Sequence, residues 1–340
     1  MTAQVPEEPT GASNGTDTRQ RVLFIGGLGR SGSTLVERLL HELGPTFAVG
    51  ETVHLWERGV RDDERCSCGA PFSQCAHWIK VGRTAFGGWD KVDLGDLIHL
   101  RWSVDRSRRM PEIMAAHLRG VTSEAQDRYR WHLQRVLTAT AEVAMLTNQC
   151  QGFGAGKTPV LLESSKHLST AALLALDEHL DVRVLHLVRD PRGVAYSWTK
   201  EVARPEADGD LMPRYRPSRT AARWVTDNLG FEALAQRVPT LSLRYEDLMA
   251  DPVATIDRIL RFMDLDPAVI DLDVLRADPI VVRNPLHSVA GNPMRFGATE
   301  LRLRLDDRWR TALPRRTERL VSAITAPLLP RYGYPLRPTD

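Results

Sequence analysis

Glycine, serine and arginine residues gather where an apolar segment near the amino terminus ends. From residue 26 to residue 34 the chain reads Gly-Gly-Leu-Gly-Arg-Ser-Gly-Ser-Thr. Glycines in such a loop allow a tight turn, so backbone amides and the amino end of a following helix can point at one anion. The sequence therefore predicts a cradle for a phosphate or sulfate ester, followed by a helix that begins near Ser33. The cradle residues are Arg30, Ser31, Gly32, Ser33 and Thr34.

One position separates this loop from those of ATP-hydrolysing proteins. Gly27 to Thr34 fits the spacing G-x-x-x-x-G-K-[ST], except that Ser33 stands where the lysine should be. The nearest cation is Arg30, whose planar guanidinium suits two oxygens of one phosphate or sulfonate group. The pattern therefore favours a shorter anion chain than a triphosphate. A nucleotide or nucleoside kinase with the same loop remains an alternative.

A second apolar segment also ends in charged residues. Residues 182–188 read as a buried parallel strand, and Arg189-Asp190-Pro191-Arg192 follows directly. Pro191 suits the first turn of a helix, which would carry Ser197 two turns later. If this strand lies beside the first, Arg189 and Ser197 can meet a second, separate anion.

The elements that must position these residues alternate along the chain. Short apolar strands are expected at residues 22–26, 46–49, 160–163, 182–188 and 240–244, with helical patterns between them. This alternation predicts an α/β fold, a P-loop-type parallel sheet flanked by helices. Residues 60–155 lack strand patterns and are expected to form a mostly helical insertion. That insertion either covers the acceptor side of the site as a cap, completes the core, or does both.

Composition limits the classes of function. The chain has 340 residues, 42% apolar content and a formal charge of +2, so it can bury a sizeable core and is not expected to bind nucleic acid. Residues 1–20 are polar and are expected to be a disordered tail without a signal peptide. Residues 21–338 are expected to form a single domain. With no stretch long and apolar enough for a membrane span, the expected location is the cytoplasm.

Together these motifs resemble the PAPS-dependent sulfotransferases, which transfer a sulfonate from 3'-phosphoadenosine 5'-phosphosulfate (PAPS). The resemblance spans about residues 20–335, and within the family it is similar to a bacterial branch that shares elements with tyrosylprotein sulfotransferases. Further segments carry it: Gly50-Glu51, the run Glu-Ser-Ser-Lys at 163–166, the run Leu-Arg-Tyr-Glu-Asp-Leu at 243–248, and the run His-Ser-Val-Ala-Gly-Asn-Pro-Met-Arg at 287–295.

The resemblance implies roles for the residues of the reaction. A base must take the proton of the acceptor hydroxyl, and Glu51 corresponds to the glutamate that serves as base in the tyrosylprotein branch. His54 is the rival base, since many cytosolic sulfotransferases use a histidine. Lys166 would assist the leaving group, with Arg30 and Ser288 sharing that task. The resemblance implies no requirement for a metal.

For the nucleotide, the resemblance implies that Arg189 and Ser197 hold the 3'-phosphate of PAPS and of its product, 3',5'-adenosine bisphosphate. Ser288 to Arg295 would help, because Gly291 and Asn292 allow an anion-binding loop. Tyr245 would contact the adenine region. The tyrosylprotein branch has a further arginine near the serine of this site, but Glu201 stands four residues past Ser197, so Arg295 or Arg302 could substitute.

Three cysteines and a histidine form a compact cluster, C-x-C-x6-C-x-H. Cys66, Cys68, Cys75 and His77 could in principle bind zinc tetrahedrally. A disulfide between two of the cysteines, or three reduced thiols, is at least as consistent with the spacing. The location suggests a structural clasp beside the acceptor wall.

The acceptor is expected to be a hydroxyl of a small molecule or glycoside, and peptidyl tyrosine is the alternative that the branch resemblance suggests. A binding protein of this fold that has lost turnover is a third possibility, and it would require Glu51 and Lys166 to point away from the cradle. The family contains both monomers and dimers, so either state is open.

Overall fold

Five apolar segments form one parallel sheet, as the sequence predicts. In the computed structural model, which describes residues 18–147, 149, 158–204, 210–296 and 299–337, the strands are β1 (Gln20–Gly26), β2 (Thr46–Gly50), β3 (Val160–Lys166), β4 (Leu180–Val188) and β5 (Thr240–Arg244). Their order is β2-β3-β1-β4-β5 and every pairing is parallel. The α/β fold with a parallel sheet is confirmed. β1 begins at Gln20, one residue inside the predicted tail, and residues 1–17 lie outside the described residues.

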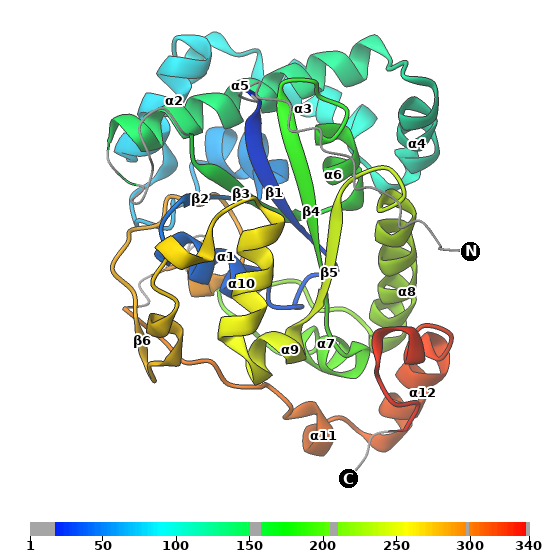
Figure 1. Ribbon diagram of the computed structural model, residues 1–340. Helices are drawn as coiled ribbons and strands as arrows, with labels where there is room; N and C mark the ends of the chain where they lie inside the picture. The colour runs from blue at the N-terminus through cyan, green and yellow to red at the C-terminus, as the bar shows by residue number, and fades with distance from the viewer. Residues whose placement is uncertain (1–17, 148, 150–157, 205–209, 297–298, 338–340) are drawn as a thin grey trace, which may run out of the picture.

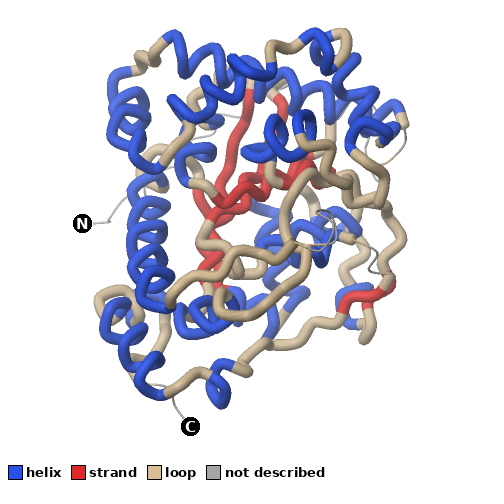
Figure 2. Tube along the Cα trace, turned by 180° about the vertical axis from the view of Figure 1, so that it is seen from behind, coloured by secondary structure: helices blue, strands red, loops and turns tan. Residues whose placement is uncertain are grey.

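Alternate residues of the central strand supply two separate cores. Leu23 and Ile25 face a cluster formed with α1 (Ser33–Glu42), α9 (Tyr245–Ala250) and α10 (Pro252–Phe262). Val22 and Phe24 face a cluster formed with the helices of the opposite layer. Because successive side chains of a strand point to opposite faces, a sheet covered on both sides needs continuous apolar strands. Figure 1 and the view from behind in Figure 2 both show the strands between layers of helices.

The predicted insertion is mostly helical in its described part, with turns and an isolated bridge between Arg65 and Pro71. It contains the π-helical turn η2 (Leu55–Arg61), the short 3-10 turns η3 (Phe72–Gln74), η4 (Trp89–Lys91) and η5 (Ser107–Arg109), and the helices α2 (Ala76–Phe86), α3 (Leu94–Val104), α4 (Met110–Arg119) and α5 (Glu124–Leu146). Leu133 and Val136 of α5 belong to the same buried cluster as Phe24 and Phe47 of the sheet. The insertion therefore completes the core on one face, and its role as a cap over the acceptor stays a prediction.

The remaining helices follow the strands of the other half. They are α6 (Leu168–Leu174), α7 (Pro191–Ser197), α8 (Pro217–Leu234), α11 (Trp309–Ala312) and α12 (Arg315–Thr325). Pro191 occupies the first turn of α7, as predicted, and Asp190 caps the helix by accepting the Arg192 amide at 2.9 Å. Two short strands, β6 (Ile280–Val281) and β7 (Glu300–Leu301), pair antiparallel. In the part of the chain described here, no helix combines the length and apolar content needed to cross a bilayer.

Between β6 and β7 the chain forms a strap, residues 282–296, coloured orange in Figure 1. Val289 of the strap lies beside the carboxyl end of β2: its amide donates to Val49 O at 3.0 Å, and its carbonyl accepts the Glu51 amide at 2.8 Å. Gly50 has φ 88°, and a Cβ there would lie 2.5 Å from Val289 O. Only glycine permits this approach, which brings the strap to the end of β2.

Candidate active site

Each of the five parallel strands ends at one of the residues that the sequence singles out. The carboxyl ends of parallel strands share one edge of a sheet, and ligands bind there beside the strand where the chain reverses direction across the sheet. That strand is β1, since the chain passes to β2 first and to β4 later. The residues at this edge are Arg30 after β1, Glu51 after β2, Lys166 at the end of β3, Arg189 after β4 and Tyr245 after β5.

The predicted cradle is a tight turn that leads into α1. Ser31 N donates to Leu28 O at 3.2 Å, and Gly32 has φ 96° immediately before the helix begins at Ser33. Within the described residues, no hydrogen bond is made by the backbone amides of Gly32, Ser33 and Thr34. These amides and the positive end of the α1 dipole are therefore available to one anion.

Arg30 places a cation inside the cradle. Its guanidinium carbon lies 5.0 Å from the ring centre of Trp198, whose indole nitrogen donates to Gly29 O at 3.0 Å. Burial lowers the pKa of Arg30, against the opposing charge of Glu51. The buried Arg30 Nε has no hydrogen-bond partner among the described residues, so the cradle fits a phosphate or sulfonate oxygen. Sequence reasoning missed Trp198, because an indole in a helix pattern is more often core.

Glu51 and Lys166 meet at the carboxyl ends of β2 and β3. Lys166 Nζ donates to Glu51 Oε1 and also to Ser164 O, the latter at 2.8 Å. Both side chains are mostly buried, with exposed fractions of 14% and 13%. Lys166 and Arg30 both adopt left-handed backbone angles, with φ 67° and 77°. Glu51 and Lys166 thus form a contact ion pair beside the cradle. This arrangement argues against a binding protein in which Glu51 and Lys166 point away from the cradle.

Burial and neighbouring charges set the state of Glu51. Burial alone would raise the pKa of Glu51, but the charge of Lys166 and smaller contributions from His54 and Arg58 lower it overall. His54 Nε2 lies 3.6 Å from Glu51 Oε2, and burial lowers the pKa of His54 to about 4 in spite of Glu51. At neutral pH the site therefore holds a carboxylate beside a neutral imidazole, and both predicted candidates for the base lie in it.

A second buried glutamate fixes the turn that carries His54. Glu163, in β3, accepts the Thr52 amide at 2.9 Å and the Thr52 hydroxyl at 2.7 Å. The Ser165 hydroxyl bonds the same carboxyl group and also accepts the Val53 amide at 3.0 Å. These bonds fix the turn η1 (Thr52–His54) directly after Glu51. Sequence reasoning gave Glu163 no separate role, although a carboxylate within an apolar strand is itself a signal.

A third buried glutamate lies on α1. Glu37 accepts the Ser164 hydroxyl at 3.0 Å, and its other oxygen has no partner among the described residues. Burial raises the pKa of Glu37 to about 7, and the charge of Lys166 opposes that rise only in part. Glu37 is therefore a buried group that titrates near neutral pH.

We expect Glu37→Gln to gain stability relative to the wild type as the pH rises from about 5 to about 8. The unfolded chain releases this proton near the ordinary pKa of 4.5, whereas the folded chain keeps it to about 7. Between these values the wild type loses stability as the pH rises. Because glutamine does not titrate, the difference in unfolding free energy should shift toward the variant by roughly 2–3 kcal/mol. Urea titrations at both pH values measure it, and an unchanged difference would contradict the prediction.

Arg189 lies against the cradle from the β4 side. Its Nη1 donates to Arg30 O at 3.1 Å and its Nη2 to Asp306 O at 2.8 Å, while its guanidinium carbon lies 4.5 Å from the Tyr245 ring centre. A Cβ on Gly32 would lie 2.7 Å from the Tyr245 ring. The structure therefore brings Arg189 and Tyr245 to the cradle. Asp306, more than a hundred residues away in sequence, gave no local signal.

Ser197, the other residue predicted for the second anion, has no contact with Arg189 or the cradle among the hydrogen bonds of the described residues. Ser197 is half-buried and is the last residue of α7, immediately before Trp198. Arg192 is fully buried and pairs with Asp190 at 2.7 Å, so the second arginine of the Arg-Asp-Pro-Arg run stabilises the start of α7. Joint binding of the 3'-phosphate by Arg189 and Ser197 stays a prediction.

The strap approaches Glu51 through its glycine. A Cβ on Gly291 would lie 3.3 Å from Glu51 Oε1. Ser288 is buried and its hydroxyl donates to Ser67 Oγ at 3.3 Å, while Asn292 accepts the Met294 amide at 3.0 Å. Arg295 donates to Ser288 O at 2.9 Å and to Arg65 O at 3.0 Å. In this state Ser288, Asn292 and Arg295 hold the strap in shape, and their contacts with a nucleotide stay predictions.

The predicted cysteine cluster forms, but with a different histidine. Free thiols of Cys66, Cys68 and Cys75 converge on His287 of the strap. His77 is not one of the four; its Nδ1 lies 3.0 Å from Gln149 Oε1 and its ring stacks on His287. His77 therefore does not belong to the cluster that the spacing suggested, and His287 of the strap takes its place.

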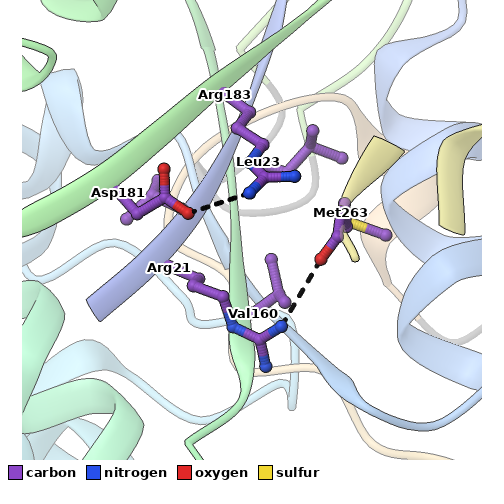
Figure 3. Close-up of a pocket in the computed structure, with 7 residues that line it drawn as sticks. Arg21, Leu23, Val160, Asp181, Arg183 and Met263 are labelled. Atoms are coloured by element: carbon purple, nitrogen blue, oxygen red, sulfur yellow. Dashed lines mark hydrogen bonds and ion pairs between the residues drawn. The ribbon is translucent and has the colours of Figure 1, made fainter. Parts of the chain in front are cut away.

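A small pocket lies at the opposite end of the strands. Arg21, Leu23, Val160, Asp181, Arg183 and Met263 surround it, as Figure 3 shows. Arg183 pairs with Asp181 at 3.3 Å, and Arg21 donates to Met263 O at 3.4 Å. Ligands of parallel sheets bind at the carboxyl ends of the strands. This pocket lies at the amino ends, beside Met263 at the end of α10, and we assign it to the packing of α10 against the sheet.

Comparison with known proteins identifies a family that matches most of the chain. The profile described as the sulfotransferase family matches residues 23–268. Carbohydrate sulfotransferase 5 of Mus musculus is 25% identical over 292 residues, which cover 78% of this chain and 68% of that protein. Among solved structures, a sulfotransferase domain from the curacin biosynthetic pathway has 17% identity and a TM-score of 0.44, covering 93% of this chain and 99% of that one. A sulfotransferase of Mycobacterium avium has 14% identity and a TM-score of 0.41, covering 94% and 79%.

Proposed function

The chain belongs to the sulfotransferase family, and we propose that it transfers the sulfonate group of PAPS to a hydroxyl of a carbohydrate or small glycoside. The observation that carries this proposal is the meeting of Glu51 with Lys166 beside the cradle that holds Arg30. A carboxylate suits the proton of a hydroxyl acceptor, and two cations suit the charge that grows on a leaving phosphate.

The proposal that PAPS binds at this edge rests on hydrogen-bonding groups of the protein that have no partner among the described residues. The amides at the start of α1 and the buried Arg30 Nε are donors without acceptors among the described residues. Arg30, Lys166 and the α1 amides would hold the 5'-phosphosulfate, and Arg189 would hold the 3'-phosphate. Tyr245 would lie at the adenine end of the same edge.

In the transfer, Glu51 accepts the proton of the acceptor hydroxyl as that oxygen bonds to sulfur. The bond between sulfur and the bridging oxygen breaks, and its electron pair stays on the 5'-phosphate. Lys166 and Arg30 stabilise that charge. Fixed cations aimed at the place where charge develops lower the barrier without reorganising during the reaction.

The ion pair gives Lys166 a second task. While Lys166 contacts Glu51, its charge lowers the pKa of that carboxyl group. When Lys166 turns to the phosphosulfate, burial of Glu51 prevails and its pKa rises, which makes it a stronger base. Binding of the donor would thus activate the base at the moment the acceptor needs it.

The acceptor class is supported by a named relative. The mouse relative is a carbohydrate sulfotransferase, which favours a saccharide hydroxyl over peptidyl tyrosine. The likeness to the tyrosylprotein branch stays a prediction. A kinase remains disfavoured, because Ser33 stands at the place of the P-loop lysine.

Calorimetric titration with 3',5'-adenosine bisphosphate, AMP and Mg-ATP tests the proposal. We expect the bisphosphate to bind at least about tenfold more tightly than AMP, because the extra phosphate adds charge-assisted hydrogen bonds. A preference for Mg-ATP would overturn the proposal in favour of a kinase. Transfer of labelled sulfonate from PAPS to saccharides, with tyrosine peptides as the comparison, then identifies the acceptor class. Transfer to the peptides alone would overturn the carbohydrate assignment.

A further inference from the structure

We propose that Cys66, Cys68, Cys75 and His287 bind one zinc ion in a structural site beside the active site. Their four ligand atoms, three Sγ and His287 Nδ1, all lie within 4.8 Å of one another. The residues come from two segments more than two hundred positions apart in the sequence. Three sulfur ligands and one imidazole form one of the usual ligand sets of structural zinc.

Three of the six separations among the four ligand atoms are close to those expected around a tetrahedral ion. Zinc bond lengths of about 2.3 Å to sulfur and about 2.0–2.1 Å to nitrogen place sulfur atoms about 3.8 Å apart and sulfur about 3.6 Å from nitrogen. Cys68 Sγ lies 3.7 Å from Cys75 Sγ. His287 Nδ1 lies 3.7 Å from Cys66 Sγ and 3.3 Å from Cys75 Sγ. The side chains are thus already arranged around one point.

The far side of the imidazole is also supported. His287 Nε2 lies 3.3 Å from Nε2 of the Gln149 side chain. The His287 ring also stacks on His77, with ring centres 4.9 Å apart and 13° between the ring planes. A histidine that binds metal through Nδ1 carries its proton on Nε2. If the side-chain amide of Gln149 is rotated by about 180°, its Oε1 can accept the hydrogen bond from that Nε2–H group. Such partners orient a metal-binding ring.

A disulfide explains the arrangement less well. The three thiols are free, and the separation of Cys68 Sγ and Cys75 Sγ, 3.7 Å, is far from the roughly 2.0 Å of a disulfide. A disulfide between any two cysteines would leave the third thiol and His287 without a role. Binding of Zn²⁺ uses all four groups, releases the thiol protons to solvent and needs no oxidant.

The ion would tie the start of the insertion to the strap. His287 immediately precedes Ser288, and the Ser67 amide donates to Ser288 O at 3.3 Å. The same strap pairs with Gly50 and brings Gly291 to Glu51. With four protein ligands the ion has no open position for substrate, so its role is to fix the strap against the end of β2.

Metal analysis of the full-length protein tests this site independently of the proposed function. Protein purified without chelator should contain one zinc per chain by inductively coupled plasma mass spectrometry. Replacing zinc with cobalt should give the intense visible absorption of a tetrahedral thiolate site. A metal-free protein that does not take up Zn²⁺ or Co²⁺ would overturn the proposal, and so would an intact mass that is two hydrogens low.

Matched variants identify the ligands. Cys68 is exposed, so Cys68→Ser removes a ligand without opening a cavity, and its zinc affinity should fall by more than about 100-fold. His77→Gln removes the stacked ring and its contact with Gln149 but no ligand, and should lower the affinity by no more than roughly 10-fold. If Cys68→Ser retained zinc like the wild type, or if His77→Gln lost it to the same extent, the ligand set would be wrong. Circular dichroism checks that both variants are folded.

Discussion

Glu51→Gln is expected to lower the turnover number by roughly 10²–10⁴-fold, the usual contribution of a positioned general base. Glutamine has nearly the same shape but cannot take the proton of the acceptor hydroxyl. The affinity for 3',5'-adenosine bisphosphate should not fall, because the change removes a negative charge beside Lys166 and Arg30. Turnover measured with saturating PAPS and calorimetry with the bisphosphate separate the two effects.

His54→Gln is the matched control for this prediction. His54 lies 3.6 Å from the same carboxylate, with a side chain that is 30% exposed against 13% for Glu51, so the change disturbs the same part of the pocket. Its turnover should remain within about tenfold of the wild type, less than the loss of a base. Normal turnover of Glu51→Gln together with an inactive His54→Gln would transfer the role of base to His54.

Arg189→Ala should weaken binding of 3',5'-adenosine bisphosphate by roughly 10–100-fold and binding of AMP far less. The guanidinium reaches the cradle loop and faces Tyr245, and charge-assisted hydrogen bonds to a phosphate contribute on this scale. The variant should therefore lose the preference for the 3'-phosphorylated nucleotide. Parallel calorimetric titrations of the two nucleotides measure it.

Arg308→Ala tests whether the effect belongs to Arg189 itself. Arg308 also pairs with Asp306, at 2.7 Å, but its side chain is 70% exposed. Like Arg189→Ala, this change removes a positive charge beside Asp306. Solvent screens the charge of the exposed Arg308 side chain. Both nucleotides should bind as in the wild type. Equal losses for bisphosphate and AMP in Arg189→Ala would show that Arg189 does not recognise the 3'-phosphate.

Local patterns predicted the sheet and the edge where the site lies. The five apolar segments became β1 to β5 with boundaries within a few residues, because buried parallel strands require continuous apolar runs. The glycine loop and Pro191 gave the starts of α1 and α7. Since parallel strands share a carboxyl edge, residues after separate strands could be grouped before any contact was known.

Contacts between distant segments were beyond such patterns. The spacing of Cys66, Cys68 and Cys75 suggested His77, the next ligand along the chain, whereas His287 arrives from the strap. Asp306 reaches Arg189 in the same way. The lack of strand patterns in residues 60–155 indicated a helical insertion, but a sequence pattern does not show what covers the apolar face of each helix.

Backbone angles at the carboxyl edge of the sheet show where this enzyme loses folding stability in order to position its charged side chains. Among the described residues, five non-glycine residues have positive φ: Arg30, Asp63, Lys166, Asp264 and Ala290. The two aspartates are of a type that tolerates this conformation, whereas Arg30, Lys166 and Ala290 lie around Glu51 and bear the ordinary penalty of roughly 1–2 kcal/mol each. The fold thus gives up stability at the points where cations must be aimed, and the buried sheet beneath them supplies the rigidity that keeps them there.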